Sequence, residues 1–132
     1  MANATSNRTA LRLVKETVFG TTPATPALQT IRYTGESLNY NIKNERSKEI
    51  RDDRNTAILV RVSSDAAGDI QFELSHKSFD TLIEASLGNT FSAPTAGLST
   101  VKNGVTPMSF TVQKAFLDAT VPVYHTFKGA RV

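Results

Sequence analysis

The sequence contains no cysteine and only two histidines. Without cysteine, neither a disulfide framework nor a thiolate metal site can form. His76 and His125 lie far apart and lack the spacing of metal ligands. Each is more typical of a partly exposed residue at a strand end. These absences argue against zinc and against histidine-based catalysis, and we expect no metal site.

Long apolar segments are also missing. No run approaches the roughly 20 residues that span a bilayer. The first 20 residues contain neither a continuous apolar region nor a cleavage-site pattern. We therefore expect a soluble protein that is neither secreted nor bound to a membrane, and the glycosylation sequons at Asn3 and Asn7 are then chance matches.

Sequence motifs of enzymes are absent too, including GxxxxGK[ST], GxGxxG, HExxH and GxSxG. The Asp52-Asp53 pair could hold a divalent cation, but the arginines on both sides favour local ion pairing. Asp69 and Glu73, if placed on one strand, would be about 13 Å apart, which exceeds the separation of glycosidase acid and base pairs. We expect no enzyme, no catalytic residue and no cofactor.

The length and composition fit one globular domain. The chain has 132 residues, of which 39% are hydrophobic and 20% charged, with a net charge of +3 and a pI of about 9.4. A basic balance favours nucleic acid or acidic partners, but here lysine and arginine are scattered among aspartate and glutamate. We predict a single domain over residues 1–132 with a flexible N-terminus at residues 1–10.

Alternating apolar and polar residues predict a mainly β fold. One strand is predicted within Ile31–Asn44, one over Thr56–Val62 and one over Gly68–Ser75, with Ser63–Gly68 as a turn by composition. Leu11 and Leu13 favour a short strand within Leu11–Phe19. The side chains predicted to face the core from these central strands are Leu38, Tyr40, Ile42, Ile70, Phe72 and Leu74.

One short helix is predicted at Ser78–Leu87, flanking the sheet. Ser78 could cap its first turn, Asp80 suits the positive end of the helix dipole, and Gly88 suits a left-handed stop. Four residues recur at helical spacing and give an apolar stripe that is predicted to join the core: Phe79, Leu82, Ile83 and Leu87.

A run of charged residues of both signs precedes the second predicted strand and contains Ile50 as its single sizeable apolar side chain. Such a run cannot be core. Runs of this kind are most often solvated loops. Because the run carries charges of both signs, it suits charge-complementary pairing with another protein surface better than phosphate binding.

The C-terminal part alternates loop and strand signals. Asn89–Pro107 is rich in glycine, serine, threonine and proline and predicts a loop or loose hairpin. Strands are predicted around Met108–Gln113 and over Val121–Lys128. Because the sequence ends at Val132, just after strand-like sequence, we expect either that another copy completes this edge or that further residues belong after Val132.

Several segments in order resemble one protein family. GTTPATPALQTIRYTGESL (Gly20–Leu38), SKEIRDDR (Ser47–Arg54), GDIQFELS (Gly68–Ser75) and SFDTLIEASL (Ser78–Leu87) are similar to the N-terminal half of major tail tube proteins of long-tailed, siphovirus-type bacteriophages. The likeness continues more faintly through Phe110–Phe116 and Tyr124–Val132. No single segment is diagnostic, but their order and spacing together are specific. Such proteins usually continue beyond the position of Val132.

The resemblance implies an antiparallel β-sandwich or barrel-like subunit with one flanking helix. It also implies a virion protein made in the bacterial host cytoplasm, six copies of which form a ring. Stacked rings would form a non-contractile tail tube that conducts DNA to the host. Tape-measure and tail-terminator proteins would be partners, and the DNA would pass without specific binding.

Two sets of site residues follow from combining the resemblance with the sequence pattern. The outward row Asp69, Gln71 and Glu73 is predicted to face the lumen, together with Ser37, Asn39 and Asn41 on a neighbouring strand. Its carboxylates would repel DNA phosphates. The charged arm is predicted to contact a neighbouring subunit or ring through Arg46, Lys48, Glu49, Arg51, Asp52, Asp53 and Arg54.

The sequence alone leaves two alternative functions open. The basic pI fits a monomeric nucleic-acid-binding β-domain, although Tyr40, Phe72 and Phe110 fall on the predicted inward rows rather than on an exposed stacking face. Another virion role, as a tail terminator, a tail-tip protein or a capsid decoration protein, would give the same pattern as a tube subunit.

Overall fold

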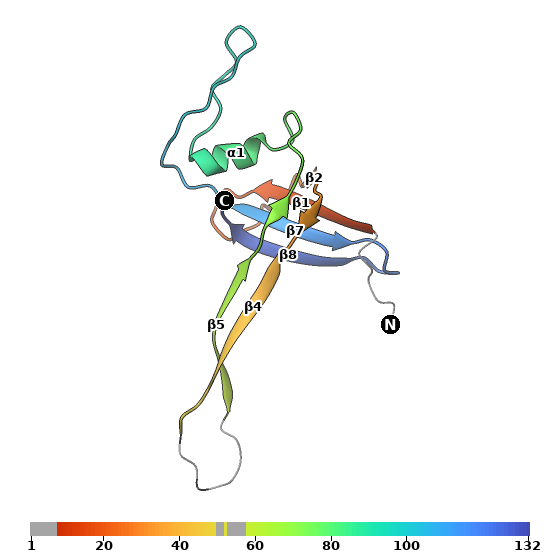
Figure 1. The fold of residues 1–132 in the computed structure, drawn as a ribbon, viewed down its shortest axis with the longest axis vertical. Helices are drawn as coiled ribbons and strands as arrows, with labels where there is room; N and C mark the ends of the chain where they lie inside the picture. The colour runs from red at the N-terminus through yellow and green to blue at the C-terminus, as the bar shows by residue number, and fades with distance from the viewer. Residues whose placement is uncertain (1–7, 50–51, 53–57) are drawn as a thin grey trace. The chain divides into compact units, whose positions relative to one another are not determined.

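The computed structural model describes residues 8–49, 52 and 58–132, and within them the chain forms antiparallel strands and one short helix (Figure 1). This confirms the predicted mainly β fold. The chain divides into two compact units, one formed by Met1–Tyr33 with Glu73–Val132 and the other by Thr34–Phe72. We describe each unit by itself.

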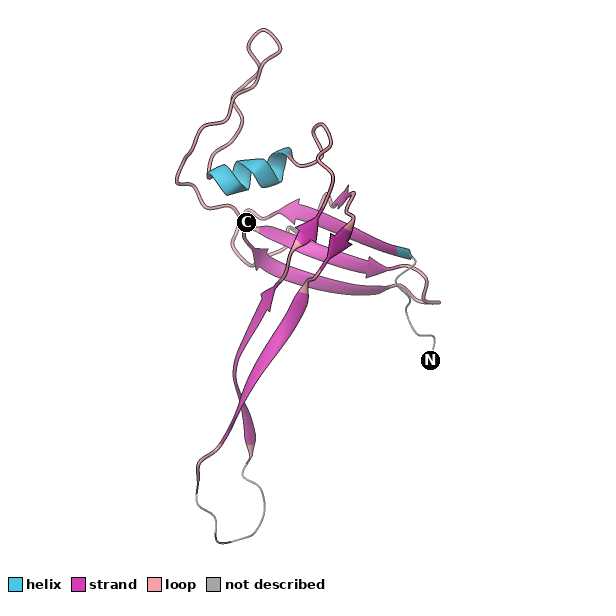
Figure 2. Ribbon diagram, in the orientation of Figure 1, coloured by secondary structure: helices cyan, strands magenta, loops and turns pink. Residues whose placement is uncertain are grey.

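The first unit is built on a four-stranded antiparallel sheet of order β2-β1-β7-β8 (Figure 2). Its strands are β1 (Thr9–Lys15), β2 (Gln29–Ile31), β7 (Phe110–Phe116) and β8 (Val123–Ala130). The central pair β1 and β7 is in register over its whole length, from Thr9 opposite Phe116 to Lys15 opposite Phe110. The sequence predicted strands at the positions of β1, β7 and β8, and the observed boundaries differ from the predicted ones by a few residues. It predicted no strand at β2.

One face of this sheet holds the core. Leu11 lies opposite Ile31 on β2, and Leu13 lies opposite Val112 on β7. All four side chains are buried, as is Phe110 on the same face. Full burial of each is worth about 1.5–3 kcal/mol. The two residues at the end of the predicted first strand, Val18 and Phe19, instead lie beyond β1 and are exposed.

The helix α1 (Asp80–Leu87) begins two residues later than predicted. Its N-cap residue is Phe79 rather than Ser78, and no side chain caps the first turn. Phe79 instead inserts into the core and is buried. The predicted stop at Gly88 is confirmed, because this residue adopts a left-handed conformation with φ of 63°. Apolar packing therefore fixes where the helix begins, in place of a polar cap.

The segment after α1 is a loop, as predicted, and its far end returns to the helix. The Gly104 N–H donates to the Leu87 carbonyl at 2.8 Å, and the Thr106 N–H donates to the Gly88 carbonyl at 3.0 Å. These bonds satisfy carbonyls that the helix end leaves free. A Cβ atom at Gly104 would lie 2.3 Å from the Gly88 carbonyl oxygen, so only glycine permits this approach.

The second unit consists of two strand pairs. β3 (Gly35–Glu36) pairs with β6 (Ile70–Gln71), and the longer β4 (Asn39–Arg46) pairs with β5 (Leu59–Ala67). We call the β4–β5 pair the ribbon. Its register shifts between Lys43 and Asn44.

Two predictions for this unit are wrong. Ser63–Ala67 is not a turn, because these residues pair with Asn39–Lys43 in the ribbon. The predicted strand Gly68–Ser75 is reduced to Ile70–Gln71. In the first case cross-strand pairing overrides small-residue composition, which is a weak and context-dependent signal. The predicted start of the Thr56–Val62 strand lies outside the described residues.

The core predicted for this part of the chain is also wrong for the single chain. Tyr40 and Ile42 are 48% and 49% exposed, and Phe72 and Leu74 are exposed as well. Leu38 and Ile70 are half-buried. Alternation shows that a strand has two different faces, but it does not show whether another layer of the same chain covers either face.

Candidate protein interface

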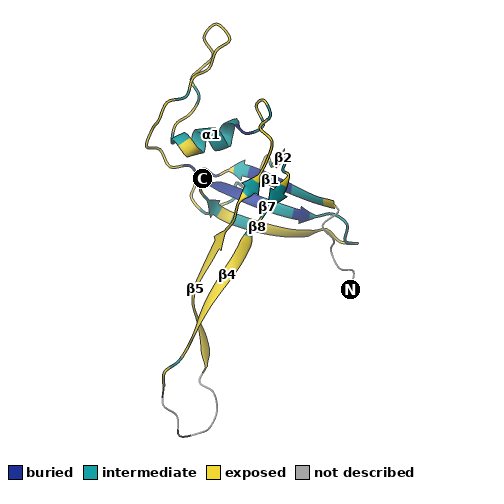
Figure 3. Ribbon diagram, viewed as in Figure 1, coloured by how far each residue is buried: buried dark blue, intermediate teal, exposed yellow. Residues whose placement is uncertain are grey.

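The ribbon exposes large apolar side chains along its whole length. Every residue of β4 and β5 is exposed (Figure 3). An isolated two-stranded ribbon is marginally stable in water at best, and exposed contiguous apolar surface marks interaction sites. The ribbon is therefore a candidate docking surface. Its exposed large apolar residues are Tyr40, Ile42, Leu59, Val60 and Val62.

One face of the ribbon combines apolar and aromatic groups with a fixed arginine. The Arg61 guanidinium donates hydrogen bonds to the hydroxyl groups of Tyr40 and Ser64 and lies 5.6 Å from the centroid of the Tyr40 ring. Ile42 lies opposite Ser64 on this face. Tyrosine and arginine are the residue types most enriched at the energetic centres of protein interfaces.

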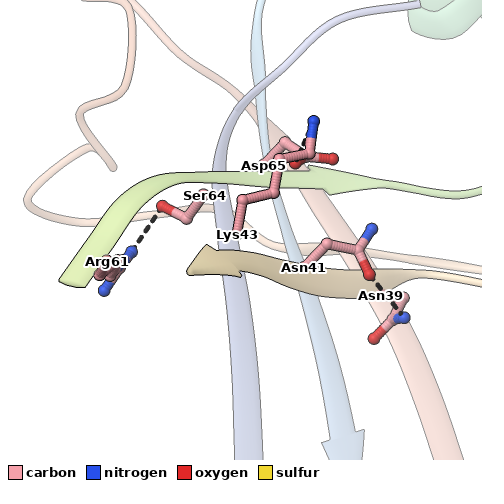
Figure 4. A network of polar contacts seen from close by, with 6 residues as sticks. All are labelled: Asn39, Asn41, Lys43, Arg61, Ser64 and Asp65. Atoms are coloured by element: carbon pink, nitrogen blue, oxygen red, sulfur yellow. Dashed lines mark hydrogen bonds and ion pairs between the residues drawn. The ribbon is translucent and has the colours of Figure 1, made fainter. Parts of the chain in front are cut away.

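The opposite face is mostly polar, with Val60 as an exposed apolar residue opposite Glu45. Asn39 donates from Nδ2 to Oδ1 of Asn41 at 3.1 Å, and Lys43 Nζ lies 3.9 Å from Asp65 Oδ1 (Figure 4). Both groups of the ion pair are mostly exposed, so the pair adds little stability. The two faces therefore present different chemistry to a partner.

The predicted contact arm connects the two strands of the ribbon. Arg46 ends β4, the Ser47 N–H donates to the Ile58 carbonyl at 3.2 Å, and the Glu49 N–H donates to Ser47 Oγ at 3.2 Å. The arm residues within the described part, none of which has an ion pair with another described residue, are Arg46, Lys48, Glu49 and Asp52. The remaining arm residues lie outside the described residues: Arg51, Asp53 and Arg54.

The predicted lumen residues are all exposed, but the structure does not bring Asp69, Gln71 and Glu73 into one strand row. Only Gln71 lies in β6, while Glu73 belongs to the other unit. Asp69 exchanges two hydrogen bonds with Ser37, since its N–H donates to Ser37 Oγ and its carbonyl accepts from the Ser37 N–H. Their role at a lumen stays a prediction.

The sheet of the first unit has one long open edge. β8 pairs with β7 on one side, and on its other side no described strand pairs with it. The other edge strand, β2, pairs with only the Leu11–Leu13 part of β1. Unpaired N–H and C=O groups along an edge are a template for pairing with another chain.

Glu16 is the residue that sequence reasoning missed. Its side chain is only 7% exposed and accepts four hydrogen bonds. Oε2 accepts from the Gly20 N–H at 2.8 Å and the Ser109 hydroxyl at 2.7 Å. Oε1 accepts from the Thr111 hydroxyl at 2.7 Å and the Gly129 N–H at 2.9 Å. One carboxylate thus joins the ends of β1, β7 and β8.

These contacts shift the titration of Glu16. Burial alone would raise the pKa of this carboxyl, but the bonds from Gly129, Ser109, Thr111 and Gly20 outweigh burial and lower the pKa from 4.5 to about 2. The carboxylate is therefore ionised at neutral pH. In the sequence Glu16 only interrupts an apolar pattern, and three of its partners lie more than 90 positions away.

The described residues contain no group of three or more potential metal ligands. His125 packs edge-on against Phe116, with ring centroids 5.5 Å apart. Within the same residues, no helix is long and apolar enough to cross a membrane.

These features define a mainly β protein with an exposed apolar ribbon and an open sheet edge, which are surfaces suited to contact other protein chains. A family described as phage tail tube protein matches residues 6–132, so the chain belongs to this family. It is a structural component of a bacteriophage tail. No curated protein matches the chain.

Proposed function

We propose that copies of this chain assemble into stacked hexameric rings, and that these rings form a hollow tail tube through which phage DNA reaches the host. The observation that supports this most directly is the exposed ribbon. Its apolar side chains are about half exposed or more in the described part of the chain, and the family is one of tube subunits. The simplest cover is another copy.

The sheet edges of the first unit supply a route to ring closure. β8 and the β2 edge are different surfaces, so pairing one with the other joins copies head to tail. A head-to-tail contact makes a closed ring when the rotation between copies divides a full turn, and an open filament when it does not. The ribbon is then available for contacts between neighbouring subunits or between rings.

The remaining parts of the proposal rest on the resemblance of the sequence to tube proteins of siphovirus-type phages. The tube would belong to a non-contractile tail, would meet tape-measure and tail-terminator proteins, and would let DNA pass without base-specific binding.

Electron microscopy of the purified protein tests the proposal. We expect uniform hollow tubes or sixfold rings, accompanied by a sedimentation coefficient that rises with protein concentration. Persistent monomers that shift labelled duplex DNA in a salt-dependent manner would contradict the proposal and favour a monomeric nucleic-acid-binding domain.

The charged arm gives a more local prediction. Replacing Asp52 and Asp53 together by lysine should abolish tubes, because the new charges oppose any complementary contact made by the arm. The monomer should remain folded by circular dichroism, since Asp52 is exposed.

The control for the arm is Ser99→Lys, which adds a positive charge at an exposed position in the loop after α1, outside both the arm and the ribbon. Tubes of normal length from the double arm variant would exclude the arm as a contact surface.

A further inference from the structure

Asn103 and Gly104 form the single Asn-Gly dipeptide of the sequence, and they lie in the loop after α1. In such a dipeptide the glycine nitrogen can attack the asparagine side chain, because glycine carries no Cβ atom that hinders the approach. Asn103 is exposed, so water reaches its side-chain amide. The dipeptide therefore has the chemical groups that it needs to modify itself.

The modification is a deamidation, and water is its only co-reactant. The Gly104 nitrogen loses its proton and bonds to Cγ of Asn103, while the bond from Cγ to Nδ2 breaks and ammonia leaves with that proton. Water then opens the resulting cyclic imide at one of its carbonyl groups. Opening at Cγ gives aspartate, and opening at the main-chain carbonyl gives isoaspartate, in which the main chain runs through Cβ and Cγ.

The folded chain holds the attacking nitrogen away from this reaction. The Gly104 N–H donates to the Leu87 carbonyl at 2.8 Å, and the Thr106 N–H donates to the Gly88 carbonyl at 3.0 Å. We call these two hydrogen bonds the lock. Gly104 also lies so close to Gly88 that an added Cβ atom would be 2.3 Å from the Gly88 carbonyl oxygen. The nitrogen therefore cannot turn toward the Asn103 side chain until the lock opens.

We propose that Asn103 is a self-modification site, whose deamidation is held back by the lock and, once it has occurred, releases the lock permanently. The reaction needs no second copy, so it does not depend on assembly into a tube. Each copy changes once, and its rate is the rate of an unfolded chain multiplied by the fraction of time for which the lock is open.

Both products weaken the contact between the loop and the end of α1. Each places a carboxylate in the residue before Gly104, near the negative end of the helix dipole, and the last turn of α1 has no basic residue to offset this charge. Isoaspartate also lengthens the main chain directly before Gly104, which shifts the N–H groups of the lock away from their carbonyl acceptors. The end of the loop is then free of α1.

Incubation of the full chain at neutral pH, with and without guanidinium chloride, measures the protection. Digestion with pepsin in acid stops the cyclisation, and mass spectrometry then quantifies aspartate and isoaspartate at Asn103. Because the lock consists of two hydrogen bonds, we expect the folded chain to react about thirtyfold more slowly than the unfolded chain. Isoaspartate identifies the cyclic route, whereas aspartate alone would show direct hydrolysis and contradict the proposal.

Gly88→Ala disturbs the lock without altering the reacting dipeptide. Gly88 has a φ of 63°, and a methyl group there would lie 3.0 Å from the Gly104 carbonyl oxygen. We expect the folded variant to deamidate about fivefold faster than the folded wild type. Gly97→Ala is the matched control, because Gly97 also has a positive φ, of 79°, but an added Cβ atom there meets nothing within 4 Å. Its rate should equal that of the wild type.

Hydrogen exchange of the wild-type chain provides a test that needs no variant. Opening of the lock exposes the Gly104 N–H to solvent and frees the same nitrogen to react. The protection factor of this amide should therefore match, within about twofold, the factor by which folding slows deamidation. A protected amide in a chain that deamidates as fast as the unfolded chain would overturn the proposal. Equal rates for Gly88→Ala and Gly97→Ala, both folded by circular dichroism, would do the same.

Discussion

Replacing Glu16 by glutamine is expected to lower the free energy of unfolding by about 3 kcal/mol. Each carboxylate oxygen accepts one hydroxyl group and one backbone N–H. A hydroxyl can rotate to accept from the new amide, but a backbone N–H cannot. In either amide orientation the N–H of Gly20 or Gly129 is left facing an NH₂ group, and an unsatisfied buried donor costs about 1–3 kcal/mol in addition to the lost charge-assisted bonds.

The same group predicts the acid response of the protein. Because the pKa of Glu16 is lowered in the folded state, its contribution to stability is fully present above pH 4.5 and is lost as the pH falls toward 2. A shift from 4.5 to about 2, at about 1.4 kcal/mol per unit, corresponds to about 3 kcal/mol. The wild-type unfolding free energy should therefore fall by about 3 kcal/mol more than that of Glu16→Gln over this range.

Urea denaturation followed by circular dichroism at a series of pH values measures both effects. Glu45→Gln is the matched control, because Glu45 lies on the exposed ribbon and its substitution should change stability by less than about 0.5 kcal/mol. Parallel pH curves for the wild type and Glu16→Gln would show that the carboxylate does not hold the three strand ends together.

The sequence predicts those helices and strands that are determined by residues close to one another in the chain. Gly88 ends α1 because a glycine readily takes the left-handed conformation there. The alternation around Phe110 and Val112 marks β7, which is the most buried strand of the sheet. In these places the residue pattern and the surrounding fold agree, so a short window of sequence suffices.

Other features depend on partners that a short window does not contain. Glu16 gains its role from Ser109, Thr111 and Gly129, which lie more than 90 positions away in the sequence. Tyr40 and Ile42 alternate like core residues, yet both are about half exposed. The pattern gives Tyr40 and Ile42 a common face of the ribbon, but it does not say which surface covers that face.

The exposed apolar face of the ribbon leads to the prediction with the largest expected effect on assembly. Ile42→Asp should abolish tubes, because a contact that buries this position would then enclose an unpaired carboxylate, which costs several kcal/mol in each copy. The isolated chain should lose only about 1 kcal/mol, since Ile42 is already half exposed. Microscopy and sedimentation report assembly, and urea denaturation reports folding.

Val105→Asp provides the comparison for this variant, because it makes the same kind of change at an apolar residue that is 98% exposed in the loop after α1. We expect tubes from Val105→Asp and none from Ile42→Asp, with both chains folded. If Ile42→Asp forms tubes as readily as the wild type, the face of the ribbon that bears Tyr40, Ile42 and Arg61 is not buried between copies, and the contact must use its polar face or the sheet edges alone.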